Sequence, residues 1–322
     1  MDRSFIYYPN DRSEKHIEIR KQQLSNLILE VLRRHPQLHY FQGFHDIVQV
    51  LLLVLGSDDS PLAVRRLSLL RIRDFMLPTI STAVTHLNLL PAILFAADRT
   101  LYHHLLPTNP FFALSATLTL YAHNIEHYSD IARLFDFLLA HDASTSIYLF
   151  ASIILLRREE LLAIDGREEP EILQFTLQKL PQPLDLENLI VRTVRLKTQH
   201  PPEKLPFGAW RRVSRYSVLK TTRDVNALRS QTLEHGEELF EKQARELRRQ
   251  QVIQHIVKTV RKTAWTYRRP AAFLSLTIAV AGVAWWLGRG QPPNQTFLAG
   301  ILRLQFWNDF ARRLPGTVRL EL

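Results

Sequence analysis

The stretch His39–Gly56 reads HYFQGFHDIVQVLLLVLG, and it decides the fold class. Its second part, Ile47–Gly56, is apolar on nearly every side and does not alternate apolar with polar residues, which is typical of a buried helix rather than a strand. A glycine after such a run commonly stops a helix, so we expect this helix to end at Gly56. Ile47–Leu55 should then lie in the core, with Gln42 exposed in front of it.

The remainder of residues 1–205 has the same helical character. Three further runs are dense in Leu, Ile and Val without alternation: Gln23–Leu32, Ala132–Leu139 and Ile147–Leu156. Prolines fall between these pieces, where helix boundaries are expected. The sequence contains no P-loop, dinucleotide fingerprint or nucleophile elbow. We therefore predict an all-α domain over residues 1–205.

The excess of basic residues is concentrated in one segment of the chain. The formal net charge is +10, but residues 1–205 carry 21 Lys and Arg against 23 Asp and Glu, whereas residues 206–270 carry 15 against 6. A nucleic-acid-binding domain would spread its basic residues over a folded face, so we expect no nucleic-acid partner. We interpret residues 206–270 as a basic linker, with an amphipathic helix over Val225–Tyr267 that is interrupted at Gly236.

A C-terminal stretch is long and apolar enough to be a membrane anchor. Ala271–Leu287 reads AAFLSLTIAVAGVAWWL and contains no charged residue. As a helix it covers roughly 25 Å, close to the hydrocarbon thickness of the endoplasmic-reticulum bilayer. Aromatic residues such as Trp265 and Trp285 flank it, and more basic residues precede than follow it, which places the N-terminal domain in the cytosol. We predict one transmembrane helix over 271–288 and a luminal tail over 289–322. A buried core helix is the alternative.

The segment His39–Asp46 carries the candidate chemistry. The side-chain amide of Gln42 can donate and accept hydrogen bonds together, which is what positioning a water for attack on a phosphate requires. On these residues alone, a helix-capping or core hydrogen-bonding role explains Gln42 better. Cysteine is absent from the chain, which excludes a disulfide scaffold, a cysteine nucleophile and a cysteine-ligated zinc site.

The tetrapeptide Tyr40-Phe41-Gln42-Gly43, followed by Asp46, resembles the Y-x-Q-G-x-x-D motif of TBC-domain Rab GTPase-activating proteins. The resemblance implies the TBC helical fold and an activator that inserts a glutamine and an arginine into the nucleotide site of a GTP-bound Rab. It places Gln42 as the glutamine, with Tyr40 and Gly43 setting the backbone geometry and Asp46 supporting the local fold or contacting the Rab. GTP and Mg²⁺ are carried by the Rab, so no cofactor of its own is implied.

Longer stretches share the resemblance. Phe111–Leu162 resembles the second half of the TBC domain, and Arg73–Ile93 and Leu180–Ile190 are similar to its endoplasmic-reticulum-anchored branch. That branch carries a C-terminal hydrophobic anchor, as Ala271–Leu287 would provide. The resemblance therefore implies a single-pass protein of the endoplasmic reticulum or early Golgi, with its N-terminal domain cytosolic.

The catalytic arginine is expected at Arg3. The family pattern is I-x-x-D-x-x-R, and this chain opens MDRSF, so Arg3 best matches the end of that pattern. The isoleucine and aspartate of the pattern would lie before Met1. The N-terminal part of the domain is therefore expected to be missing from this chain.

Two alternative functions remain open at this point. The first is a catalytically impaired Rab-binding scaffold on the membrane, which the shortened N-terminus would favour. The second is a membrane zinc metalloprotease, because His123–His127 reads HNIEH and matches the H-x-x-E-H zinc pattern. Two histidines at i and i+4 can share a helix face, but a catalytic zinc needs a third protein ligand.

Overall fold

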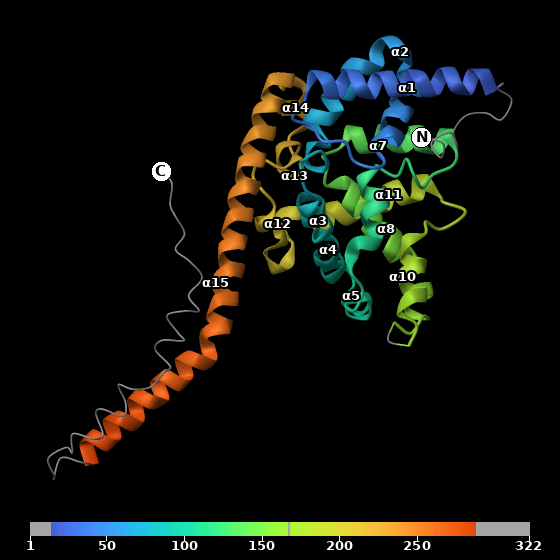
Figure 1. The fold of residues 1–322 in the computed structure, drawn as a ribbon. Coiled ribbons are helices and arrows are strands. Elements are labelled where there is room, and N and C mark those ends of the chain that lie inside the picture. The colour runs from blue at the N-terminus through green and yellow to red at the C-terminus, as the bar shows by residue number, and fades with distance from the viewer. Residues whose placement is uncertain (1–13, 167, 288–322) are drawn as a thin grey trace. The chain divides into compact units, whose positions relative to one another are not determined.

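The computed structural model describes residues 14–166 and 168–287, and within these ranges it contains helices and no strands (Figure 1). The all-α prediction is confirmed. The first helices and 3₁₀ turns are α1 Glu14–Arg34, α2 Phe44–Leu70, η1 Arg73–Phe75, α3 Ser81–Leu87, α4 Leu89–Ala97, α5 Arg99–Leu105, η2 Pro110–Ala113, α6 Leu114–Leu118, α7 Tyr128–Ala140 and α8 Thr145–Leu156. The later ones are α9 Arg158–Leu162, α10 Pro170–Gln178, α11 Leu186–Gln199, η3 Pro202–Lys204, η4 Pro206–Gly208, α12 Ala209–Arg212, α13 Val218–Thr221, α14 Val225–Ser230 and α15 Leu233–Leu287.

The core is built on α2 and α8, which contain two of the runs that the sequence shows as rich in Leu, Ile and Val. α1 packs along α2, and α8 packs against α11 and α4. In α8 the residues Thr145–Ile154 are all buried, as expected for a helix with neighbours on every side. The predicted runs Ile47–Gly56 and Ile147–Leu156 lie within α2 and α8, but α2 continues beyond Gly56 to Leu70, where no helix was predicted.

Gly56 breaks α2 as predicted. Its backbone is non-helical, with φ 76° and ψ −176°, and the chain resumes a helical path after it to Leu70. The buried run in front of it is shorter than predicted. Ile47–Leu52 is buried, but Val54 and Leu55 are 50% and 39% exposed, because the middle of α2 around Gly56 leaves the core, which the helix meets again from Val64 to Leu70.

The domain extends further along the chain than the predicted boundary at residue 205. One compact unit ends at Arg248 and a second begins at Arg249. Apolar side chains beyond 205 belong to the same core, namely Ala209, Val213, Leu219, Phe240, Ala244 and Leu247. Ion pairs also join this part to the rest, since Arg223 contacts Asp142 at 2.6 Å. Much of the segment interpreted as a linker is therefore a structural part of the domain.

Gly236 does not interrupt the helix, contrary to the prediction. α15 is helical through it, and Gly236 lies buried against α2. A Cβ at this position would come within 2.9 Å of the Leu69 Cβ and 3.0 Å of the Leu70 Cδ2. The glycine therefore permits close helix packing instead of ending a helix. Glu237, the next residue, accepts a 2.6 Å hydrogen bond from His35 Nδ1.

Among the described residues, one helix, α2, is long and apolar enough to cross a membrane by length and composition. Its partial burial and the break at Gly56 identify it instead as a core helix. The predicted anchor Ala271–Leu287 forms the end of α15, but the side chains of residues 271–276 and 286–287 lie outside the described part. The tail 289–322 lies wholly outside it. The membrane span therefore stays a prediction.

Candidate functional site

Gln42 lies in a tight turn that leads into α2. The Phe44 N–H donates to the Phe41 carbonyl at 3.1 Å, which closes the turn, and the Asp46 N–H donates to the Gly43 carbonyl at 3.1 Å, which starts the helix. The Gln42 side chain is exposed, as predicted. Its amide has no intramolecular hydrogen bond within the part of the chain described here. It is thus free to bind something outside the domain.

Gly43 fixes the direction in which Gln42 points. Its φ of 103° lies in the region that favours glycine, and it is the residue that precedes the first turn of α2. A Cβ here would also lie 2.5 Å from the Thr119 Cγ2. Both strain and collision therefore exclude a side chain at this position. The predicted role of Gly43 in setting the backbone has a clear physical basis.

The segment that packs on Gly43 has an unusual backbone of its own. Leu120 and Tyr121 have φ values of 50° and 68°, which are costly for residues with side chains, about 1–3 kcal/mol each. Tyr121 is fully buried and donates a 2.8 Å hydrogen bond to the Ser146 carbonyl, which holds the segment in place. This turn brings Thr119 against Gly43 and His123 to the start of α2.

Asp46 is the centre of a polar cluster, which we call the Asp46 cluster and which comprises Tyr40, His45, Asp46 and His123. Asp46 is buried, with His123 Nδ1 at 3.2 Å from Oδ2 and His45 Nε2 at 3.3 Å from Oδ1. The Tyr40 hydroxyl lies 2.7 Å from the other nitrogen of His45, Nδ1. The cluster therefore ties both sides of the Gln42 turn to a residue 77 positions away.

The hydrogen bond between His45 and Tyr40 agrees with a neutral imidazole. Burial lowers the pKa of His45, against the opposing effect of the Asp46 carboxylate. A neutral ring can accept at Nδ1 from the Tyr40 O–H, while its Nε2 lies 3.3 Å from Asp46 Oδ1. Burial and the Asp46 charge both raise the pKa of Tyr40, so its hydroxyl keeps its proton. Tyr40 thus hydrogen-bonds His45, which in turn lies against Asp46 beside Gln42.

Aromatic packing holds the same turn from the inside. The Phe41 ring contacts Phe44 with centroids 5.7 Å apart and Phe75 with centroids 6.1 Å apart. Phe75 in turn contacts the His86 ring at 5.2 Å. Phe41 therefore anchors the turn to η1, while the neighbouring Gln42 faces outward.

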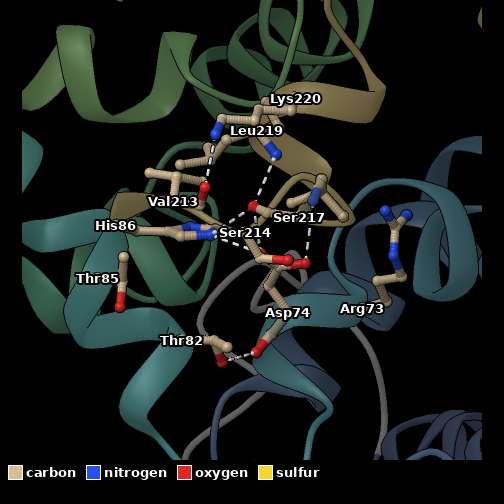
Figure 2. Close-up of polar contacts among 12 residues, drawn as sticks. Arg73, Asp74, Thr82, Thr85, His86, Val213, Ser214, Ser217, Leu219 and Lys220 are labelled. Atoms are coloured by element: carbon tan, nitrogen blue, oxygen red, sulfur yellow. Dashed lines mark hydrogen bonds and ion pairs between the residues drawn. The ribbon is translucent and has the colours of Figure 1, made fainter. Parts of the chain in front are cut away.

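A second cluster of Asp, His and Ser lies in the interior, and Figure 2 shows it around Asp74. We call it the Asp74 cluster, and it comprises Asp74, His86, Ser217 and Val218. Asp74 accepts from the Ser217 hydroxyl at 2.5 Å, from the Val218 N–H at 3.0 Å and from His86 Nε2 at 2.8 Å. Its neighbour Arg73 is fully buried and donates to the Tyr216 carbonyl.

The Asp74 cluster is not arranged as a catalytic triad. In a triad the histidine lies between the serine and the aspartate. Here the Ser217 hydroxyl and His86 Nε2 both bind the Asp74 carboxylate, and Ser217 and His86 are 3.4 Å apart. All three side chains are buried, so no substrate reaches the hydroxyl. The cluster fastens residues 217–218 to η1 and α3, which is a structural role.

The predicted site residues are partly brought together. Gln42, Tyr40, Gly43 and Asp46 form one constellation, whereas Arg3 lies outside the described residues. Sequence reasoning missed His45 as a partner of Asp46, although it stands inside the quoted motif. Asking which donors satisfy a buried aspartate would have pointed to it.

The zinc alternative loses its geometric basis. His123 and His127 lie in a turn and an extended segment before α7, so they do not share a helix face as that alternative required. His123 is engaged with Asp46. Within residues 14–166 and 168–287, no group of three or more His, Cys, Asp or Glu side chains is placed to hold a metal ion.

Comparisons with known proteins place this site in a family. The Rab-GTPase-TBC domain matches residues 1–162, which include the Gln42 turn and His123. GTPase-activating protein gyp10 of Schizosaccharomyces pombe is 34% identical over 228 residues, 69% of this chain and 60% of that protein. Human TBC1 domain family member 20 is 36% identical over 205 residues, 63% of this chain and 50% of that protein. The chain thus spans about half to three fifths of these relatives.

Proposed function

The chain belongs to the Rab-GTPase-TBC domain family, and on that premise we propose that it accelerates GTP hydrolysis by a Rab GTPase through Gln42. The observation that carries the proposal is the state of this side chain. Gln42 is exposed and free of internal hydrogen bonds, yet it stands on a turn that Gly43 and Asp46 hold rigid. A group held ready in this way loses little freedom when it enters a partner's site.

In the proposed mechanism, Gln42 orients the water that attacks the terminal phosphate of the Rab-bound GTP. The amide oxygen accepts a hydrogen bond from that water, and the amide N–H₂ donates to the phosphate or to the attacking oxygen. The Rab supplies GTP and Mg²⁺. An arginine in trans neutralises charge on the phosphates and is worth roughly 10³–10⁵ in rate. We assign that role to Arg3.

The Asp46 cluster supports the mechanism without taking part in proton transfer. A single carboxylate binds His45 on the near side of the turn and His123 on the far side. Preorganised geometry determines how well a group stabilises the transition state. Weakening the contacts of Asp46 should therefore reduce the rate of GTP hydrolysis even though Gln42 itself is not mutated.

We also propose that the protein is attached to an endoplasmic-reticulum or early Golgi membrane. Support comes from the uncharged stretch Ala271–Leu287 and from the helical backbone of α15, which continues to Leu287. The excess of basic residues before it favours a cytosolic domain. Protease treatment of intact microsomes tests the orientation. Digestion of a C-terminal tag with protection of an N-terminal tag would overturn it.

Single-turnover GTP hydrolysis across a panel of Rab proteins tests the function. On a Rab that the chain stimulates, Gln42→Ala should lower the rate by two or more orders of magnitude, about 3 kcal/mol of barrier. The melting temperature should not change, because the amide is exposed. Gln178→Ala, at an exposed glutamine on α10, is the matched control. A Rab that has leucine in place of its own glutamine should still be stimulated.

Two outcomes would count against the proposal. An unchanged rate for Gln42→Ala would remove the glutamine mechanism. Binding of GTP-bound Rab proteins without any stimulation of hydrolysis would favour the scaffold function instead.

A further inference from the structure

α15 carries an exposed apolar stripe in the second compact unit, Arg249–Leu322. The stripe consists of five β-branched residues: Val252, Ile253, Ile256, Val257 and Val260. Each is between 54% and 61% exposed. The spacing i, i+1, i+4, i+5, i+8 places all five on one face of a helix that turns every 3.6 residues. Exposed aliphatic residues gathered in this way mark an interaction surface.

The other face of the same segment is basic. Residues 249–262 contain four basic residues and no acidic one. At about 100° per residue, Lys258 and Lys262 project from the side opposite the stripe, Arg261 borders the stripe, and Arg249 lies one turn before it. The segment is therefore a short amphipathic helix with an aliphatic face and a cationic face.

Charge and width argue against a second copy of the chain as the partner. Helices that pair in a coiled coil use a narrow seam with three- and four-residue spacing, and opposite charges beside the seam set the pairing. Here the stripe is wider than such a seam, because it includes adjacent residues. The flanking charges all have the same sign, so two parallel copies would bring like charges together.

A membrane surface fits both faces. An interfacial helix buries its apolar face at the boundary of the acyl chains, while Lys and Arg on the polar face are attracted to anionic headgroups. Pro270, which lies between the stripe and the uncharged stretch, lacks an N–H and favours a kink in the helix. A helix that lies along the surface can thus change direction before Ala271.

We propose that residues 249–262 form a membrane-surface binding segment that recognises anionic phospholipids through its basic face and inserts the Val252–Val260 stripe at the interface. This surface is distinct from the Gln42 site and does not depend on the activity proposed for it. It would hold the start of the second unit at the membrane independently of a transmembrane span.

The absence of cysteine from the chain allows a direct test. Ile256→Cys and Gln254→Cys each provide one attachment point for an environment-sensitive fluorophore, the first on the stripe and the second on the opposite face. Both full-length proteins are reconstituted into vesicles of phosphatidylcholine with or without phosphatidylserine. The label at 256 should shift to shorter emission wavelength and be quenched by lipid-borne nitroxide, and more so with phosphatidylserine. The label at 254 should remain water-exposed.

A second variant separates the stripe from the anchor. Ile253→Gln with Val257→Gln should abolish lipid quenching of the label at 256, while resistance of the protein to alkaline extraction, which reports the transmembrane span, stays unchanged. Equal water exposure at 254 and 256 would overturn the proposal. So would shielding of 256 from water without lipid quenching, which would show that another protein segment or a second copy covers the stripe.

Discussion

The Asp46 and Asp74 clusters both contain aspartate and histidine, but they have different roles in the protein. Each has a buried aspartate that binds histidine, 3% exposed for Asp46 and 1% for Asp74. At Asp74 the donors are buried as well. At Asp46, His123 leaves half of its side chain exposed, and Tyr40 is 49% exposed. Water can therefore replace a lost partner at the Asp46 cluster but not at the Asp74 cluster.

The difference separates stability from function. Because Asp74 accepts hydrogen bonds from three buried donors at once, its removal leaves them without partners and lowers the free energy of unfolding. Because the Asp46 cluster borders solvent, its contacts can be weakened while the domain stays folded. The effect is then a less rigid turn around Gln42. The rings of Phe41, Phe75 and His86 connect the two clusters, so their independence can be tested.

The largest expected effect is at the interior cluster. Asp74→Ala should reduce the free energy of unfolding by roughly 3–5 kcal/mol, because it leaves the Val218 N–H, the Ser217 hydroxyl and His86 without an acceptor. Chemical denaturation measures the loss. The GTPase stimulation per folded molecule should stay within about threefold of the parent. A loss of stimulation in the folded fraction would show that the ring contacts couple the two clusters.

Acid should destabilise the parent through the same residue. Burial raises the pKa of Asp74, but the hydrogen bond from His86, the charges of His86 and Arg73 and the Ser217 hydrogen bond together lower it from 3.8 to about 2. The folded-state pKa lies below the unfolded one, so this stabilisation is present above about pH 4 and is lost as the pH falls toward 2.

The loss amounts to roughly 2 kcal/mol. It is measured as the difference between the parent and Asp74→Asn in unfolding free energy at several pH values from 5 to below 3. Other carboxylates contribute to both proteins and cancel in the difference. Parallel curves for the two proteins would contradict the assignment.

At the surface cluster, Asp46→Ala should lower the single-turnover rate about tenfold, equivalent to roughly 1.4 kcal/mol, because both histidine contacts of the Gln42 turn are lost. The free energy of unfolding should fall by only about 1 kcal/mol. Asp46→Asn keeps an acceptor for His123 and should lie between the parent and Asp46→Ala in rate. A large loss of stability with an unchanged rate would reverse the roles of the two clusters.

The smallest effect is expected for Tyr40→Phe. It removes only the hydroxyl that bonds His45, at a half-exposed position, so the rate should fall about two- to threefold, equivalent to roughly 0.5 kcal/mol. Pre-steady-state measurement on one stimulated Rab resolves such a change, with Tyr128→Phe, an exposed tyrosine on α7, as the matched control. A tenfold or greater loss would mean that the hydroxyl contacts the Rab directly.

Much of the fold could be predicted from periodicity, because a helix that is buried on one or all sides shows this in the residues along it. We could predict the first part of α2, its break at Gly56 and α8 in this way. The boundary at 205 and the role of Gly236 were wrong, because a charged amphipathic segment looks alike whether its apolar face meets water, lipid or a domain. Residues 206–248 pack onto core residues such as Leu69 and Asp142. These partners are distant in sequence, so the packing could not be predicted from the local pattern.

The sequence by itself determined the helical class, the motif that holds Gln42, and the concentration of basic residues after residue 205. These are local properties, written in spacing and composition. Only the tertiary structure decided that His123 meets Asp46 from 77 residues away, and that Ser217 meets Asp74 from 143 residues away. Such pairings depend on the path of the chain between them, and many histidines and serines could have served equally well as donors. The motif supplied Gln42, and the fold supplied the contacts that hold its turn in place.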